Sequence, residues 1–348
     1  MLLDGLHIPL TTPFYPDGRI YLRKLEHNAE RYSRTPASGL TILGRTGERS
    51  LLSDDETRQI LSTAIAASAT QKVMMANVSR DGVSNTLDLA EFAASQGYDA
   101  VFLQLPGVLA GGAANLKLQR IYFQAIADRS SLPIVLEDHA SLPIDLLAEL
   151  SANPTFLGIA LYPDRLERLQ QVKAATAQAA REVVVTSIFA AVTRRMSAPP
   201  EAPAAGNYIS AGSLIGGATA LATAPPAPAI KTRSKKVGFQ ILNARTSALL
   251  QALEAGAAGS ILPFAASAPQ AVHEVFAAWK DGDPKLAAEK QTRLLAAAAE
   301  IEEKLGVAAL KAACDLNGYF GGKPRLPLLP LSGEERSVVE GLLAGMRN

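Results

Sequence analysis

The sequence predicts a (β/α)8 barrel, an α/β fold of TIM-barrel type, followed by a helical C-terminal extension. Short apolar segments alternate with amphipathic stretches at a nearly regular spacing, which is typical of parallel strands joined by crossover helices. The apolar segments begin near Leu6, Gly39, Val73, Val101, Ile134 and Phe156. A chain of 348 residues with 48% hydrophobic residues is long enough for one such barrel and an extension.

The stretches between these segments carry helix signals of their own. Ser53 and Glu56 form a capping box, which predicts a helix that begins near Asp54. Apolar residues spaced three and four positions apart predict a helix around Leu87 and another around Ile121. Each helix would cover the strand that precedes it.

The regular spacing ends after the sixth strand and a helix over about 164–180. Val183–Val185 and Val237–Leu242 are both candidates for the seventh strand. The first is followed by a segment rich in Pro, Ala and Gly. The second is followed by a helical stretch and a clear eighth strand, Gly259–Phe264, so we assign Val237–Leu242 to the barrel. The barrel then covers 1–282, with an insertion at about 188–236, and the helical extension covers 283–348.

The insertion is strongly basic at its end, where Lys231, Arg233, Lys235 and Lys236 lie close together. Such a charged stretch is expected to be a solvated surface excursion. A lid over the barrel or a subunit contact is the alternative.

Composition narrows the class of partner. Lys plus Arg number 34 and Asp plus Glu 33, so the net charge of +1 gives no field that recruits nucleic acid or an anionic membrane. Cys314 is the only cysteine, which excludes an internal disulfide and a zinc site built on two thiolates of this chain. The first residues have neither a signal-peptide pattern nor a membrane-span pattern. We therefore expect a cytoplasmic protein whose partner is a small molecule.

Several separated motifs resemble the dihydrodipicolinate synthase and N-acetylneuraminate lyase family. They occur in the family's order and at the expected places relative to the predicted strands. They are Thr12-Pro13-Phe14, Gly44-Arg45-Thr46-Gly47-Glu48, Leu132-Pro133-Ile134-Val135-Leu136, Gly158-Ile159, Gly321-Gly322, Pro324-Arg325 and Leu326–Ser332.

The resemblance implies an aldolase-type chemistry without a cofactor. In this family a lysine at the end of the sixth strand forms a Schiff base with pyruvate, and a tyrosine at the end of the fifth strand moves protons. The loop after the second strand, which matches Gly44–Glu48 here, holds the carboxylate of a 2-oxo acid. Family members are commonly dimers of dimers, so the resemblance also implies a homo-oligomer, a dimer or a tetramer.

This sequence departs from the family pattern where the chemistry is carried. Ala160 stands at the lysine position, and Glu137-Asp138 replaces the tyrosine and its neighbour. Arg45 replaces the first hydroxyl residue of the carboxylate loop, and Leu142 stands where an arginine often follows. We therefore expect that the pyruvate Schiff-base mechanism is lost.

A lysine from elsewhere is the alternative to that loss. Lys231, Lys235 and Lys236 of the insertion could in principle reach over the barrel mouth. A Schiff-base lysine needs a buried and positioned amine, which a flexible charged stretch does not favour.

The candidate site residues lie at the ends of strands two and five. Glu137 is the candidate general acid or base, since it takes the place of the tyrosine. The candidate substrate-binding residues are Arg45, Thr46, Gly47, Asp138 and His139, with Arg45 and Thr46 as the anion clamp.

Other interpretations of these residues remain open. Arg45 and Glu137 could form a buried ion pair that fills an inactive site. A metal held by Glu137, Asp138 and His139 has no recognised ligand spacing, so we predict no metal. Two hypotheses follow. One is a lyase that handles a small 2-oxo acid or related carboxylate without a Schiff base, and the other is an inactive barrel that binds a small acid or a protein partner.

Overall fold

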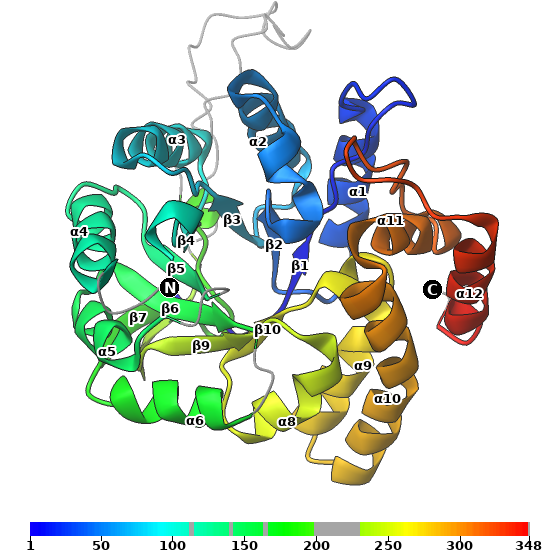
Figure 1. The fold of residues 1–348 in the computed structure, drawn as a ribbon. Coiled ribbons are helices and arrows are strands. Elements are labelled where there is room, and N and C mark those ends of the chain that lie inside the picture. Colours follow the sequence, from blue (N-terminus) through cyan, green and yellow to red (C-terminus); the bar gives the residue numbers. More distant parts are fainter. Residues whose placement is uncertain (111–114, 139–141, 163–165, 198–229, 347–348) are drawn as a thin grey trace, which may run out of the picture.

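The computed structural model describes residues 1–110, 115–138, 142–162, 166–197 and 230–346. Eight parallel strands form a closed barrel in the order β1-β10-β9-β6-β5-β4-β3-β2, which confirms the predicted fold class (Figure 1). The strands are β1 (Gly5–Pro9), β2 (Gly39–Ile42), β3 (Val73–Asn77), β4 (Ala100–Gln104), β5 (Ile134–Asp138), β6 (Phe156–Leu161), β9 (Gln240–Asn243) and β10 (Gly259–Ile261).

Helices surround the barrel. They are α1 (Leu22–Ser33), α2 (Asp54–Ala67), α3 (Val83–Gln96), α4 (Leu116–Ala127), α5 (Ile144–Ala152), α6 (Leu166–Ala175), α8 (Leu249–Glu254) and α9 (Pro269–Lys280). Short 3₁₀ turns follow several strands: η1 (Arg45–Gly47), η2 (Arg49–Leu51), η3 (Gly107–Leu109), η6 (Thr246–Ala248) and η7 (Pro263–Ala266). Helix α2 begins at Asp54, and the predicted capping box of Ser53 and Glu56 is present. No helix of the described residues is long and apolar enough to cross a membrane.

The C-terminal extension is helical, as predicted, and lies outside α9 and near α1 (Figure 1). It consists of α10 (Pro284–Ala297), the π-helical η8 (Ala298–Lys304), α11 (Gly306–Leu316) and α12 (Gly333–Leu343). Helix α11 contacts η1 and η7, and η8 contacts η6 and η7. The extension therefore reaches the loops at the carboxyl ends of β2, β9 and β10.

The segment between α6 and β9 leaves the barrel. Strands β7 (Arg181–Thr186) and β8 (Thr232–Val237) pair with each other in an antiparallel hairpin, and α7 (Arg194–Ser197) follows β7. Val183–Val185 thus belongs to this hairpin, whereas the seventh barrel strand is β9. The predicted strand Val237–Leu242 began too early, because Val237 ends β8 and pairs with Arg181. Of the expected insertion, residues 198–229 lie outside the described residues.

The hairpin lies at the amino-terminal end of the barrel. Arg181 donates hydrogen bonds to the carbonyls of Ser151 and Phe156, which precede or begin β6. Arg195 donates to the carbonyls of Ser68 and Lys72 ahead of β3. The lysines of β8 are therefore at the end opposite the barrel mouth.

The barrel interior is packed with apolar side chains below the mouth. Inward-facing residues alternate along each strand. The interior cluster contains Leu3, Val73, Met75, Ala100, Phe102, Val135, Leu157, Ala160, Leu242, Ala244 and Ile261. In the same alternation Glu137 faces inward above Val135.

Candidate functional site

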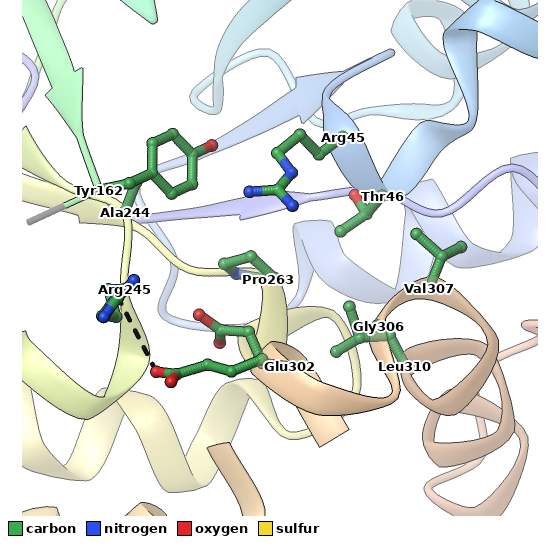
Figure 2. A pocket seen from close by; sticks show the side chains of 11 residues that line it. Arg45, Thr46, Tyr162, Ala244, Arg245, Pro263, Glu302, Gly306, Val307 and Leu310 are labelled. Carbon is green, nitrogen blue, oxygen red and sulfur yellow. Dashed lines mark ion pairs between the residues drawn. The ribbon is translucent and has the colours of Figure 1, made fainter. Parts of the chain in front are cut away.

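Two adjoining cavities lie at the carboxyl ends of the barrel strands. The upper chamber has a volume of about 190 Å³ and is lined by Arg45, Thr46, Tyr162, Ala244, Arg245, Pro263, Glu302, Glu303, Gly306, Val307 and Leu310 (Figure 2). The lower chamber has only about 20 Å³ and is lined by Pro9, Thr41, Gly44, Arg45, Thr46, Asn77, Phe102, Glu137, Ala160, Tyr162, Ile261 and Pro263. Arg45, Thr46, Tyr162 and Pro263 belong to both walls and so separate the two spaces.

Glu137 is the acidic group of the lower chamber. The β5–β6 register places it directly opposite Ala160, and its side chain is buried. One carboxylate oxygen accepts a hydrogen bond from the Tyr162 hydroxyl at 2.9 Å, and the other accepts one from the Asn77 amide at 2.9 Å. The Arg49 guanidinium lies 3.9 Å away. Within the described part of the chain, Asn77, Tyr162 and Arg49 thus stabilise the negative charge of this carboxylate.

Among the described residues, the cation that pairs with Glu137 is Arg49, whereas the sequence had suggested Arg45. Arg49 is half-buried in η2, and burial lowers its pKa against the opposing effect of Glu137. It also donates to the Gln104 amide oxygen at 2.7 Å, which fixes its position. The exposed Arg45 instead lies over the ring of Tyr162, 5.5 Å from the centroid. Among the described residues, Arg45 takes part in no ion pair.

The loop after β2 is fixed by hydrogen bonds to the end of β1 and the residues that follow it. The Thr46 hydroxyl faces the carbonyls of Pro9 and Leu10, each at 3.2 Å, and donates toward them. The Gly47 carbonyl accepts a hydrogen bond from the Thr12 hydroxyl at 2.7 Å. Thr46 therefore lines both chambers while its proton is directed to the backbone. Gly47 is not among the described residues that line either chamber.

Glu48 ties the same loop to the C-terminal extension. Its φ of 53° is in the left-handed region, which is uncommon for a residue with a side chain. Its carboxylate pairs with Lys311 of α11, and both side chains have 0% exposure. The carboxylate also accepts the Arg325 backbone NH at 2.8 Å, and the Lys311 ammonium lies 4.4 Å from the Phe14 ring centroid. The ion pair thus fixes the loop that carries Arg45.

Asp138 points in the opposite direction from Glu137. Its carboxylate accepts the Leu142 backbone NH at 2.7 Å and the Arg168 guanidinium at 2.8 Å. Asp138 thus joins the end of β5 to α6 and does not line either chamber in the described part of the chain. The third candidate at this strand end, His139, lies outside the described residues.

The structure adds residues that the sequence did not single out. Tyr162 follows Ala160 by two positions, directly after β6 ends at Leu161, and so faces the same side, a signal that strand alternation offered. Burial, followed by the charge of Glu137, raises its pKa well above the ordinary value. Asn77 ends β3 in the same way.

Two acidic groups come from the C-terminal extension, where no strand pattern pointed to them. Glu302 accepts hydrogen bonds from the Thr246 hydroxyl at 2.5 Å, the Thr246 backbone NH at 3.2 Å and the Phe264 NH at 3.2 Å. Burial raises the pKa of Glu302 to about 6, against the effect of these donors. The neighbouring Glu303 pairs with Arg245 at 3.9 Å (Figure 2).

Neither a lysine nor a metal-ligand cluster is found among the described residues of this site. The described lining of the two chambers contains arginines but no lysine. No group of three His, Cys, Asp or Glu side chains in the described ranges could hold a metal ion. Among the described residues, the polar side chains that line the two chambers are therefore two arginines, a tyrosine, an asparagine, two threonines and three glutamates.

A barrel whose polar side chains gather at the carboxyl ends of the strands has the site location of (β/α)8 enzymes. The model of the dihydrodipicolinate synthetase family matches residues 2–184 and 227–345. The chain belongs to this family.

Known relatives agree with this assignment. The 4-hydroxy-tetrahydrodipicolinate synthase of Acidiphilium cryptum is 24% identical over 350 residues, which cover 99% of each chain. The L-threo-3-deoxy-hexylosonate aldolase of Hypocrea jecorina is 25% identical over 341 residues, which cover 97% of this chain and 93% of the relative. The 4-hydroxy-tetrahydrodipicolinate synthase of Xanthomonas axonopodis is 32% identical over 164 residues, so the chain spans about half the length of that relative (53%).

A solved structure shows the same fold. Dihydrodipicolinate synthase from Thermotoga maritima superposes with a TM-score of 0.77 at 18% identity, over 99% of each chain. At this identity the similarity concerns the fold.

Proposed function

We propose that this protein binds a small 2-oxo acid or related carboxylate at the barrel mouth and moves a proton on it without a Schiff base. The observation that carries the proposal is the position of Glu137, a buried carboxylate that faces Ala160 across the β5–β6 pair. A base at this place reaches the region where the resemblance puts the reacting carbon. Ala160 offers no amine, so the chemistry left to the site is acid–base chemistry.

The proton path runs through Tyr162. Its hydroxyl donates to Glu137 at 2.9 Å, and its side chain lines both chambers. A substrate in the upper chamber can lose the proton next to its keto group to the tyrosine oxygen, while the tyrosine proton passes to Glu137. The charge that develops on the keto oxygen is then balanced by a cation. On return of the proton the enzyme is unchanged.

Arg45 supplies the positive charge that balances the keto oxygen, and it also binds the substrate carboxylate. Its guanidinium is exposed at the chamber wall, over the Tyr162 ring. A planar guanidinium binds a carboxylate with two parallel hydrogen bonds. Thr46 contributes by fixing the loop through the Pro9 and Leu10 carbonyls. Binding would therefore move Arg45 from the ring to the ligand.

The small lower chamber favours a second candidate, an inactive barrel that binds a small acid. A volume of about 20 Å³ holds roughly one water molecule. If Arg45 and Tyr162 stay in place, a ligand reaches the upper chamber but not Glu137. Binding without turnover is the signature of this candidate.

Turnover assays with a matched control test the proposal. The protein is assayed against 2-oxo acids and sugar acids, together with Glu137→Gln and with Glu182→Gln, an exposed control on the hairpin at the other end of the barrel. We expect turnover that falls about 10²- to 10⁴-fold in Glu137→Gln and is unchanged in the control. Turnover equal in both variants would remove Glu137 from the chemistry.

Borohydride reduction in the presence of pyruvate separates the proposal from the family's usual mechanism. We expect the intact mass of the protein to remain unchanged. A reduced pyruvate adduct on any lysine would replace the proposal with a conventional class I aldolase.

A further inference from the structure

The upper chamber has a wall that the proposed chemistry does not use. The π-helical segment η8 carries Glu302, and η8 and the beginning of α11 contribute Glu303, Gly306, Val307 and Leu310 to the chamber lining. π-Helical turns are rare and often occur at functional sites. Here the turn aims a carboxylate into a cavity whose other wall carries Arg45.

Glu302 is positioned from both neighbouring strand ends. Thr246 after β9 and Phe264 after β10 together donate three hydrogen bonds to its carboxylate. A carboxylate has about four acceptor positions, so one remains for a donor in the chamber. Figure 2 shows the carboxylate of Glu302 and the guanidinium of Arg45 on opposite sides of Pro263, with the guanidinium extended toward Tyr162.

The two ends of the upper chamber carry different charges. Arg45 provides the cationic end beside Tyr162. At the other end Arg245 is paired with Glu303, and Glu302 adds a further acceptor. Val307 and Leu310 of α11, the helix that contacts η1, add an apolar side near Thr46 (Figure 2). A ligand that matches has an anion at one end and hydrogen-bond donors at the other.

We propose that Glu302 of the C-terminal extension is a substrate-binding residue that accepts hydrogen bonds from hydroxyl or ammonium groups at the end of the substrate distal to its carboxylate. The inference rests on the proposed function, since it assumes that Arg45 holds that carboxylate. It narrows the substrate class to small acids with a polar, donor-bearing tail.

Binding of matched acids tests the inference. Calorimetry compares butanoate, 4-hydroxybutanoate and 4-aminobutanoate, and then the corresponding six-carbon acids, which differ only at the terminal group. For the wild type we expect the donor-bearing acid of the matching length to bind about tenfold tighter than its methyl analogue, as one hydrogen bond to a charged acceptor provides. The hydroxyl and ammonium arms show which donor the site prefers.

Glu302→Gln should remove this preference while binding of the methyl analogue persists. Glu300→Gln, the same change on the same helical segment outside the chamber lining, should keep it. Equal affinities in the wild type, or a preference that survives in Glu302→Gln, would overturn the inference and leave the proposed function standing. A wild type that binds none of the acids would overturn both.

A pH comparison on the unmodified protein covers the case in which Glu302→Gln does not fold. Because burial raises the pKa of Glu302 to about 6, the carboxylate is largely charged at pH 7.5 and largely neutral at pH 5. Glu303, Arg245, Arg45 and Tyr162 share the chamber, so butanoate at both pH values serves as the reference. The preference for the ammonium tail should fall at pH 5, and a preference equal at both values would contradict the inference.

Discussion

Replacing Lys311 with methionine should loosen the loop that carries Arg45. Lys311 and Glu48 form an ion pair with 0% side-chain exposure on both partners. Removal of one partner leaves an uncompensated buried charge, which costs about 3–5 kcal/mol. Glu48 also holds a left-handed backbone, with a φ of 53°, that this pair helps to maintain. Loss of the ion pair therefore destabilises the loop Gly44–Glu48 directly.

Thermal and urea unfolding measure the effect. With an unfolding entropy of about 2.1 cal/mol/K per residue, a loss of about 4 kcal/mol lowers the Tm of a chain of this length by about 5–6 °C. Lys311→Met combined with Glu48→Gln should recover part of the loss, because the unpaired charge is gone.

Lys304→Met is the control, since Lys304 pairs with Glu300 at 2.8 Å on an exposed helix surface. An exposed pair of this kind contributes only about 0.3–0.5 kcal/mol. A Tm of Lys311→Met that equals that of the control would refute the role of the buried pair.

Two further predictions concern His7 and Tyr162. Burial lowers the pKa of His7 from 6.5 to about 4. The unfolded chain therefore binds a proton at His7 more tightly than the folded chain does. This difference contributes about 3 kcal/mol to the free energy of unfolding above pH 6.5, and the contribution is lost as the pH falls toward 4. Urea unfolding of His7→Gln should lack this component, and an identical acid dependence would contradict the assignment. Tyr162→Phe removes the donor to Glu137 but keeps the ring under Arg45, so turnover should fall at least about a hundredfold while the affinity for butanoate changes little. Full turnover in this variant would exclude the proton path through the hydroxyl.

The strands of the barrel were predictable because their burial leaves a simple signal. Continuous apolar runs at Val73, Ile134 and Phe156 begin strands in the structure at those residues. The choice of the seventh strand depended on what followed it, since Val183–Val185 is as apolar as a barrel strand. That segment pairs instead with the basic strand β8, a long-range antiparallel contact that local sequence does not specify.

The site was predictable only where strand alternation determines direction. Glu137 and Ala160 are register partners in β5 and β6, and the same alternation could have identified Tyr162. The position of Arg49 could not be predicted in this way. Arg49 lies in a 3₁₀ turn, and the path of that turn depends on the ion pair of Glu48 with Lys311. Glu302 depends on the packing of the C-terminal helices across the mouth, a tertiary contact with no periodic signature.

Solvent exchange of the substrate tests the central claim most directly. Pyruvate is incubated in D₂O with the protein, and NMR follows the replacement of its methyl protons by deuterium. Proton transfer through Tyr162 to Glu137 predicts exchange that is catalysed by the wild type and by Glu182→Gln and is slowed at least about a hundredfold in Glu137→Gln. Exchange at the wild-type rate in Glu137→Gln, or none in the wild type, would contradict the account.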